Sequence, residues 1–451
     1  MECSTTDWLE RYHAALILTV RVRLLDRAGT LAELLRRVGD SCTPIGDVRI
    51  VGTERDTKVR DVQLFCTDEH HRDAVLEAID STEDVEIVSV TDEVLESHRG
   101  GPIATVARER LDSTMKLRMV YTPGVARVCE LVAERPEAAW SYTGKGERVA
   151  IVTNGTAVLG LGDIGPLAAL PVMEGKAAIL AEFAGVSAEP MLVDSRDPDE
   201  VVDVVAKCAL SYGLIQLEDI AAPACFEIER KLADRLDVPV FHDDQHGTAT
   251  VVAAGFLNAL ERTGRTAEEV RAVVLGAGAA GSAIARMLVD LGVDDVVVCD
   301  STGIVARGRG GMNVWKEELA EVTNQDGLEG GLDVAIRGRD VFVGVSRPNA
   351  LSPKLVRTMA DRPIVFALAN PVSEIGVHEA MEAGAEIAID GRSMNNALAF
   401  PGLFRGALDA RARCISTEMK LAAARTLAAA ATGDSLLPDM LDHGVHRAVA
   451  V

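Results

Sequence analysis

Apolar residues recur with two different periods along the first part of the chain, and their order predicts a small N-terminal fold. Residues 14–25 (AALILTVRVRLL) alternate as a strand does, and residues 30–40 (TLAELLRRVGD) place apolar side chains at helical spacing. Two more strand patterns, a helix pattern and a last strand pattern follow, at residues 45–67, 69–80 and 85–92. The order βαββαβ is that of a ferredoxin-like split unit, so we predict a separate domain over residues 1–95.

The rest of the chain alternates short apolar runs with helical patterns, which is typical of an α/β fold. Runs such as RVAIVTN, PMLVD and VPVFHDD predict the strands of an α/β domain over residues 96–245, the domain for which the acidic residues and the family resemblance given below imply the binding of substrate and metal. Residues 271–300 carry the patterns of a strand, a glycine-rich turn, a helix and a strand, and further strand patterns follow. We therefore predict a doubly wound, Rossmann-type NAD(P)-binding domain with C-terminal helices over residues 246–451.

Two segments match the letters GxGxxG, one at residues 160–165 (GLGDIG) and one at residues 276–281 (GAGAAG). A dinucleotide-binding turn follows a strand, opens a helix and has an acidic residue about 20 positions later. The second segment meets these conditions, since RAVVL precedes it, an amphipathic helix pattern follows it, and the next strand pattern ends at Asp300. The residues predicted to contact the cofactor in this turn are Gly276, Gly278, Ala279, Ala280 and Gly281.

The first glycine segment fails the same test. Asp163 would place a carboxylate among amides that face phosphate, and Pro166 and Pro171 interrupt the segment that follows. We interpret this segment, Gly162 and Asp163 included, as a tight turn beside the substrate.

Asp300 bears on the choice of cofactor. A carboxylate at that position accepts hydrogen bonds from the ribose hydroxyls of NAD and repels the 2′-phosphate of NADP. Arg307 and Arg309 follow closely, however, and offer cations to such a phosphate. We predict that NAD is favoured and keep NADP as the alternative.

Composition and charge narrow the function classes. A formal charge of −23 repels polyanions, and an aromatic content of 4% leaves little material for stacking on bases, so we expect no nucleic-acid partner. The N-terminal segment MECSTTDWLERYH lacks the apolar region of a secretory signal, and no apolar run approaches the ~18 residues of a membrane span. The cysteines are scattered, without a CxxC pair or a zinc pattern. We expect a soluble, cytoplasmic protein without a membrane partner.

Acidic residues gather at the ends of two predicted strands. Glu218 and Asp219 follow one apolar run, and Asp243 and Asp244 follow another. The carboxyl ends of parallel strands meet at one rim of a sheet, where such acids would repel one another unless a hard cation neutralised them. Oxygen ligands of this kind suit Mg²⁺ or Mn²⁺, although two solvated turns or helix caps would give the same pattern. His242 and His246 flank the acids in a strand end and turn, so we expect supporting roles for them rather than zinc ligation.

Lys176 lies in an apolar helical pattern, and Tyr121 precedes a Thr-Pro-Gly turn. A buried lysine near a metal can have a lowered pKa and act as a base. Taken singly, a surface lysine and a packed aromatic residue explain these two positions as well.

The order of the motifs YTPGVA, GLGDIGP, MEGKA, LEDIAAP, FHDDQHGTA, LGAGAAG, FALANP and NNALAFPG resembles that of the shorter, bacterial-type malic enzymes over residues ~100–430. The resemblance implies oxidative decarboxylation of (S)-malate to pyruvate and CO₂ with NAD(P) and Mg²⁺ or Mn²⁺. It implies Glu218, Asp219 and Asp244 as metal ligands, with Asp243 in support. It also implies Tyr121 and Lys176 as general acid and base, and Asn370 and Asn396 as residues near the substrate carboxylate and the nicotinamide.

The segment LLDRAGTLAELL resembles the start of ACT domains, which often pair and bind small effectors, commonly amino acids. We therefore expect a homodimer and an effector, with a purely structural role as the alternative. In one position the chain departs from the longer malic enzymes, because Ala157 replaces an arginine that grips malate. Other interpretations are a malolactic enzyme, an amino-acid dehydrogenase and a non-catalytic ACT-regulated protein.

Overall fold

The computed structural model describes residues 16–158 and 160–451. The start of the predicted N-terminal domain lies outside the described residues. The chain divides into two compact units between Ala104 and Thr105. The predicted division of the second unit at residue 245 stays a prediction.

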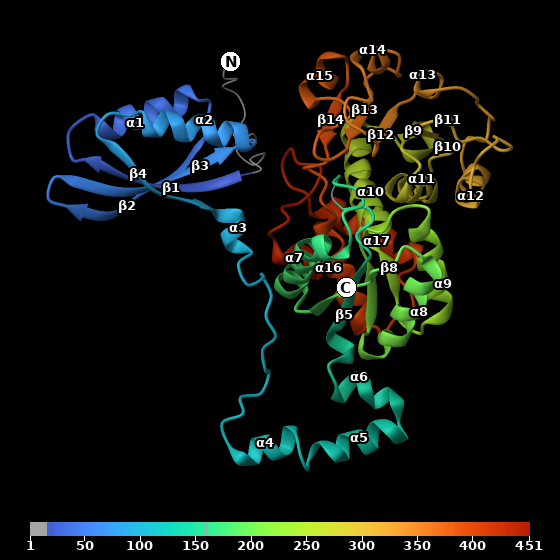
Figure 1. The fold of residues 1–451 in the computed structure, drawn as a ribbon. Coiled ribbons are helices and arrows are strands. Elements are labelled where there is room, and N and C mark those ends of the chain that lie inside the picture. The colour runs from blue at the N-terminus through green and yellow to red at the C-terminus, as the bar shows by residue number, and fades with distance from the viewer. Residues whose placement is uncertain (1–15, 159) are drawn as a thin grey trace. The chain divides into compact units, whose positions relative to one another are not determined.

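The first unit has the predicted element order βαββαβ followed by a short helix (Figure 1). Its sheet is antiparallel with the strand order β2-β3-β1-β4. The elements are β1 (Leu16–Leu25), α1 (Thr30–Asp40), β2 (Ile45–Glu54), β3 (Thr57–Cys66), α2 (Glu69–Asp80), β4 (Val85–Asp92) and α3 (Glu93–Ser97).

Strand alternation decides which face of this sheet is covered. Leu18, Val20, Val22 and Leu24 are buried on β1, and they join Leu34 of α1 in one hydrophobic core beneath α1 and α2. Gly29 adopts a φ of 97° in the turn before α1, a conformation that side chains disfavour. Cys42 is disulfide-bonded, which the scatter of cysteines does not predict.

The second unit begins with short helices and contains two sheets. The smaller sheet has the order β6-β5-β7-β8, and all its strands are parallel. The elements up to the last of these strands are α4 (Thr114–Val120), α5 (Val125–Glu134), η2 (Pro136–Ala138), α6 (Ala139–Tyr142), η3 (Lys145–Glu147), β5 (Arg148–Thr153), α7 (Pro166–Ala184), β6 (Ser187–Leu192), α8 (Pro198–Cys208), η4 (Ala209–Ser211), β7 (Leu214–Leu217), α9 (Ala224–Arg235) and β8 (Val240–His242).

The larger sheet has the order β11-β10-β9-β12-β13-β14, parallel except for the short edge strand β11. This is the predicted doubly wound arrangement, with its change of winding direction between β9 and β12. Its elements are α10 (Asp243–Thr263), η5 (Ala267–Glu269), β9 (Arg271–Leu275), α11 (Ala279–Asp290), β10 (Asp295–Asp300), β11 (Gly303–Ile304), α12 (Val314–Val322), α13 (Leu332–Ala335), β12 (Val341–Gly344), α14 (Pro353–Val356), β13 (Ile364–Ala367), α15 (Val377–Glu382), β14 (Ile387–Asp390), η6 (Asn396–Leu398), α16 (Phe400–Asp409), α17 (Thr417–Ala430) and α18 (His443–Val449).

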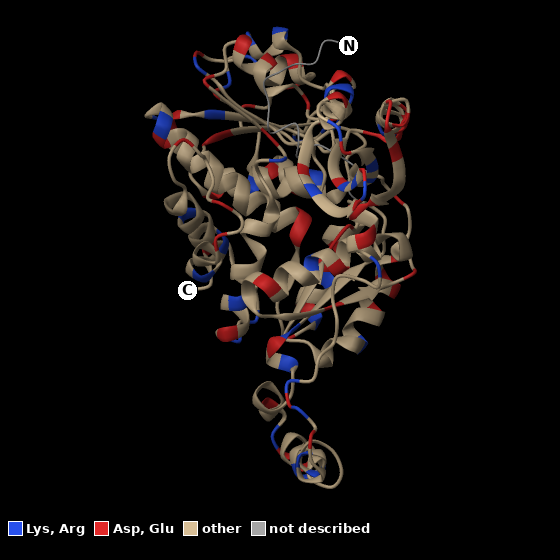
Figure 2. Ribbon diagram, turned by 90° about the vertical axis from the view of Figure 1, so that its left-hand side faces the viewer, with Lys and Arg blue, Asp and Glu red and all other residues tan. Residues whose placement is uncertain are grey.

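The inner strands β5, β7, β9, β12 and β13 are buried on both faces, which explains their continuous apolar runs. Acidic positions are spread along most elements rather than gathered in one patch (Figure 2). In the described part of the chain, no helix has both the length and the apolar character needed to cross a membrane.

Candidate active site

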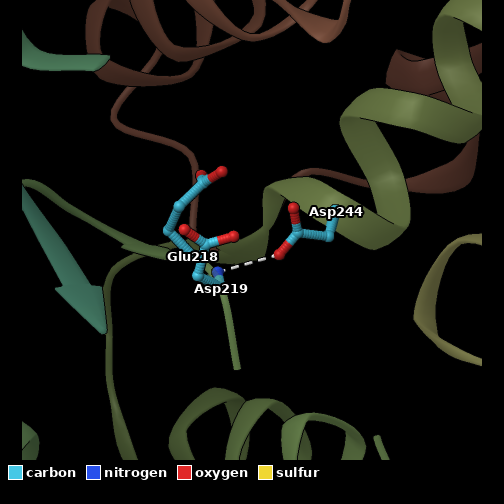
Figure 3. Close-up of side chains that lie close together, drawn as sticks. All are labelled: Glu218, Asp219 and Asp244. Carbon is cyan, nitrogen blue, oxygen red and sulfur yellow. Dashed lines mark hydrogen bonds between the residues drawn. The ribbon is translucent and has the colours of Figure 1, made fainter. Parts of the chain in front are cut away.

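The two acidic pairs predicted from the sequence meet at one rim of the smaller sheet. Glu218 and Asp219 directly follow β7, and Asp244 lies in the first turn of α10, directly after the neighbouring strand β8. One carboxylate oxygen from each of Glu218, Asp219 and Asp244 lies within 4.8 Å of the others. The backbone N–H of Asp219 donates to Oδ2 of Asp244 over 2.9 Å, which fixes the loop against the helix (Figure 3). We call these three acids together with Asp243 the carboxylate cluster.

Helix α7 delivers Lys176 to the same place. Its Nζ lies 2.5 Å from Oδ2 of Asp243, 3.1 Å from Oε1 of Glu218 and 3.2 Å from Oδ1 of Asn396. The ring of Phe400 lies on another side, with 4.7 Å between Nζ and the ring centroid. The side chain of Lys176 is only 11% exposed, so these contacts replace most of its water shell.

The charges of this site do not balance, because four acids surround one ammonium group. Burial raises the pKa of Glu218 well above its ordinary value, and the neighbouring acids add to the effect of burial against the attraction of Lys176. Burial alone would lower the pKa of Lys176, but Asp243 and Glu218 outweigh it and raise that pKa. The pKa of Lys176 is thus raised in the site without a cation, whereas the predicted lowering concerns the site with a bound metal and stays a prediction.

The same imbalance makes the residues fit a divalent cation. Oδ1 of Asp243 is buried and has no hydrogen-bond partner among the described residues, and Glu218 is 2% exposed. Buried carboxylates with an excess of negative charge are costly unless a cation compensates them. Their hard oxygen donors suit Mg²⁺ or Mn²⁺.

Glu229 on α9 supports the start of α10, a role that no pattern along the chain indicates. Its carboxylate accepts hydrogen bonds from the backbone N–H of His242 and from Nε2 of Gln245, each over 2.9 Å, and contacts Nε2 of His246 over 3.0 Å. Burial alone would raise the pKa of Glu229, but the two histidines and these hydrogen bonds lower it to about 2. His246 thus contacts an acid behind the cluster, in line with the supporting role expected for it.

The first glycine segment begins beside the carboxylate cluster. The backbone N–H of Ala157 donates to the carbonyl of Asp219 over 3.0 Å. Gly160, Gly162 and Gly165 all have positive φ between 77° and 83°, so the segment is a tight turn as predicted. Asp163 itself is not brought to the cluster. Its carboxylate pairs with Arg196 on the surface, and this pair lowers the pKa of Asp163. None of these contacts supports the predicted role of Asp163 beside the substrate.

The second glycine segment joins β9 directly to α11. Gly276 has a φ of 119°, and a Cβ there would lie 2.6 Å from the carbonyl oxygen of Val345, which follows β12. A Cβ at Gly281 would lie 1.8 Å from the carbonyl oxygen of Gly276. Only glycine fits this close approach, and the turn opens at the change of winding direction, where open α/β sheets bind ligands.

Asp300 lies at the end of β10, as predicted, but its carboxylate is already engaged. Arg309 and Lys316 donate to it over distances of 2.5 to 3.0 Å, and Thr302 donates to it from both its backbone N–H and its hydroxyl. These donors lower the pKa of Asp300 against the effect of burial. We call Asp300, Thr302, Arg309 and Lys316 the Asp300 cluster; no motif of the sequence points to Thr302 or Lys316.

The two predicted asparagines occupy different surroundings. Asn396 contacts Lys176, as described above. Asn370 is exposed in the loop after β13, and a Cβ at Gly160 would lie 3.0 Å from its carbonyl oxygen. The Asn370 loop therefore packs against the first glycine segment at Gly160.

Tyr121 is not brought to Lys176. It follows α4, its side chain is 66% exposed, and α4 and α5 contain no buried residues. Met115, Met119 and Val120 of α4 are exposed as well. The predicted acid and base thus do not form a pair within the described chain.

Two family models match the chain, the malic enzyme N-terminal domain over residues 103–197 and the malic enzyme NAD-binding domain over residues 245–443. The NAD-dependent malic enzyme of Geobacillus stearothermophilus is 44% identical over 428 residues, which is 94% of this chain and 89% of that protein. The chain belongs to the malic enzyme family. Within this malic enzyme, Lys176 lies in the first matched range, and the second glycine segment and Asp300 lie in the second.

Other comparisons agree with this assignment. The bifunctional malic/malolactic enzyme of Bacillus subtilis (strain 168) is 46% identical over 376 residues, which is 80% of this chain and 92% of that protein. The crystal structure of the NAD-dependent malic enzyme of Thermotoga maritima has a TM-score of 0.76 and 44% identity, and the match covers 79% of this chain and 97% of that chain. Membership of the malic enzyme family decides against an amino-acid dehydrogenase.

Proposed function

We propose that the protein catalyses the oxidative decarboxylation of (S)-malate to pyruvate and CO₂, with NAD favoured over NADP as the electron acceptor. The observation that carries the proposal is the carboxylate cluster with Lys176 in contact with it. Membership of the malic enzyme family and the match to an NAD-binding domain support it.

We propose Glu218, Asp219 and Asp244 as the residues that hold Mg²⁺ or Mn²⁺. When bound, the metal would supply positive charge next to the C2 oxygen and C1 carboxylate of malate and stabilise the negative charge that develops during decarboxylation. Asp243 would keep Lys176 in place through its 2.5 Å contact.

Lys176 would take the proton of the C2 hydroxyl while hydride leaves C2 for the nicotinamide. The contacts with Asp243 and Glu218 hold it as an ammonium group, so this role requires that the charge of these acids be compensated. Asn396 would orient the lysine through its Oδ1, and the Phe400 ring would limit the access of water. Asn370, whose loop packs on the first glycine segment, would contact the nicotinamide region.

Tyr121 would protonate C3 of the enol product. Because it is exposed on α4 together with apolar neighbours, we propose a homodimer in which α4 and α5 pack against a second copy. Sedimentation velocity, combined with Met119→Glu on α4, tests this arrangement. Dimers that persist with Met119→Glu would argue against an interface through α4.

We further propose that residues 1–95 form an ACT-like domain that binds a small effector, commonly an amino acid for such domains. The βαββαβ order of the first unit supports this proposal. Activity measured with a panel of amino acids tests it, and a response that persists after removal of the domain would contradict it. A cytoplasmic location stays a prediction from the sequence.

The decisive experiment is a spectrophotometric assay with malate and Mn²⁺, with NAD or NADP as the acceptor. We expect free NADH and pyruvate, and loss of activity with EDTA. Lactate as the sole product, without free NADH, would instead favour a malolactic enzyme, the second activity named for the Bacillus subtilis relative. Activity that survives EDTA would contradict the metal site.

A further inference from the structure

A buried acid outside both clusters joins two loops at the rim of the larger sheet. Glu374 lies between β13 and α15, and its side chain is fully buried. Its Oε1 accepts hydrogen bonds from the backbone N–H of Ser346 over 2.7 Å and from the hydroxyl of Ser346 over 3.1 Å. Its Oε2 accepts a hydrogen bond from the backbone N–H of Ala369 over 3.1 Å. One carboxylate therefore bridges residues 345–352, which we call the Ser346 loop, and residues 368–376, which form the Asn370 loop.

The end of β12 leaves room for this carboxylate. A Cβ at Gly344, the last residue of β12, would lie 2.5 Å from Cδ of Glu374 and 2.8 Å and 2.9 Å from its two oxygens. Any larger residue would push the carboxylate out of its place. The backbone N–H of Leu351 donates to the carbonyl of Glu374 over 3.0 Å, so its main chain holds the Ser346 loop as well. A buried carboxylate is costly unless donors replace its water shell, and the two loops supply these donors.

Each of the two loops packs on one of the glycine segments. A Cβ at Gly276, in the second segment, would lie 2.6 Å from the carbonyl oxygen of Val345 in the Ser346 loop. A Cβ at Gly160, in the first segment, would lie 3.0 Å from the carbonyl oxygen of Asn370. Ala369, one of the donors to the bridging carboxylate, directly precedes Asn370. The bridge thus connects the loop that backs the nucleotide turn to the loop that carries Asn370.

We propose that Glu374 is a positioning residue for the hydride transfer of the proposed function. Its carboxylate fixes Asn370, the residue proposed for the nicotinamide region, relative to the second glycine segment. Displacement of a positioned group by about 1 Å can cost about 100-fold in rate, so a small shift of the Asn370 loop is enough to slow the reaction. This inference rests on the proposed function and on the proposed role of Asn370.

The first test follows the loops themselves, without substrate, metal or cofactor. Glu374→Gln keeps the shape of the side chain, but its Nε2 is a donor and must face the backbone N–H of either Ser346 or Ala369, so one hydrogen bond of the bridge is lost. We expect the amides of residues 345–352 and 368–376 to exchange hydrogen for deuterium about 10-fold faster, measured by mass spectrometry. Residues 276–281 should keep their exchange rate. Glu379→Gln, at an exposed acid of α15, is the matched control and should leave both loops unchanged.

The second test asks whether Glu374 acts through Asn370. With malate, NAD and Mn²⁺, Glu374→Gln should lower kcat by about 30-fold and change the KM for NAD by less than about threefold. In an Asn370→Ala background, the same change should lower kcat by less than about threefold, because the group that Glu374 positions is already gone. A purely structural role would lower kcat by the same factor in both backgrounds.

The outcomes that would overturn the proposal are unchanged exchange of the two loops in Glu374→Gln, or the full loss of kcat in the Asn370→Ala background. If Glu374→Gln fails to fold, Ser346→Ala decides, since it removes only the hydroxyl donor. It should lower kcat by about threefold, and this loss should vanish in the Asn370→Ala background; an equal loss in both backgrounds would overturn the proposal. An unaltered protein that forms no NADH from malate would contradict the proposed function, and the exchange measurement would then decide alone on the bridge between the loops.

Discussion

The carboxylate cluster and the Asp300 cluster both lie at the ends of strands in the two sheets. Their net charges have opposite signs. The first sets four acids against the single ammonium of Lys176, and the second sets two cations against the single carboxylate of Asp300. The pKa shifts follow this count, since burial and neighbouring acids raise the pKa of Glu218, whereas the cations lower that of Asp300. The comparison teaches that the two clusters carry uncompensated charge of opposite sign, so the first favours a cationic ligand and the second an anionic one.

The largest effect that this comparison predicts is a separation of chemistry from cofactor binding. Lys176→Ala should lower kcat by about 10³-fold, as expected for the loss of a proton-transfer residue, and should leave NADH affinity within about threefold. Stopped-flow assays and NADH titration measure the two quantities. Lys354→Ala, at an exposed lysine of α14, is the control. Activity within a few-fold of the unaltered enzyme would remove Lys176 from the mechanism.

The converse change should weaken cofactor binding and spare the metal site. Gly281→Val would place a Cβ 1.8 Å from the carbonyl oxygen of Gly276, so the turn must distort. We expect NADH affinity to fall by about 100-fold, because the bound pyrophosphate depends on the amides of this turn. Binding of Mn²⁺, followed by electron paramagnetic resonance, should persist. Gly162→Ala in the first glycine segment is the comparison, and it should leave NADH affinity unchanged.

The opposite charge balance also predicts opposite effects on stability. Asp300→Asn leaves two cations without their anion and should lower the free energy of unfolding by about 2 kcal/mol at pH 7. The folded-state pKa of Asp300 is depressed, so its contribution is present above the unfolded pKa of about 3.9 and is lost as the pH falls below that value. The difference between variant and unaltered protein should therefore shrink in acid, as urea unfolding at pH 7 and pH 3.5 measures.

Glu218→Gln removes one negative charge from the carboxylate cluster, where acids outnumber cations. In EDTA at pH 7 we expect the melting temperature to stay the same or rise, because the remaining acids then repel one another less. With Mn²⁺ added, the unaltered protein should gain stability that the variant lacks. If the variant is clearly less stable than the unaltered protein in EDTA, the negative charges of this cluster are already compensated without a metal.

The smallest predicted effect concerns Glu229, which holds the start of α10 through its hydrogen bonds. Glu229→Gln keeps a hydrogen-bond acceptor for His242 but loses the charge that faces His246, and should cost about 1 kcal/mol. The pKa of about 2 for Glu229 means that this contribution is complete above pH 4.3 and disappears as the pH falls toward 2. Thermal unfolding between pH 3 and pH 7 tests it; a cost that is independent of pH would show that charge plays no part.

The parts of the site that follow from local order were predictable from the sequence. Glu218 and Asp244 follow apolar strands that lie side by side in a parallel sheet, so their meeting is a consequence of topology. The glycine turn at residues 276–281 is recognisable because strand, turn and helix are contiguous. In the first glycine segment, by contrast, β5 ends at Thr153 and α7 starts at Pro166, and the same letters build a different turn.

The features of the two clusters that could not be predicted from the sequence depend on contacts between different elements of the fold. Lys316 reaches Asp300 only because of the path taken by the loop before α12, and Arg307, closer in sequence, turns away. Glu229 is one charge among several on α9, and nothing in its spacing indicates that it faces the start of α10. Tyr121 follows a helix that contains no buried residue, and no periodicity in the sequence reveals this exposure.

Helix α10 has a consequence for how this protein can be rebuilt. It starts at Asp243, runs for 21 residues and packs along α11, the helix that opens at the glycine turn. Insertion of one residue in its middle would turn everything beyond by about 100° and shift it by 1.5 Å. Chimaeras that join the metal-binding half of one relative to the nucleotide-binding half of another must therefore preserve the rotational phase of this helix, because an error of a single residue would misalign the donor and acceptor of the hydride.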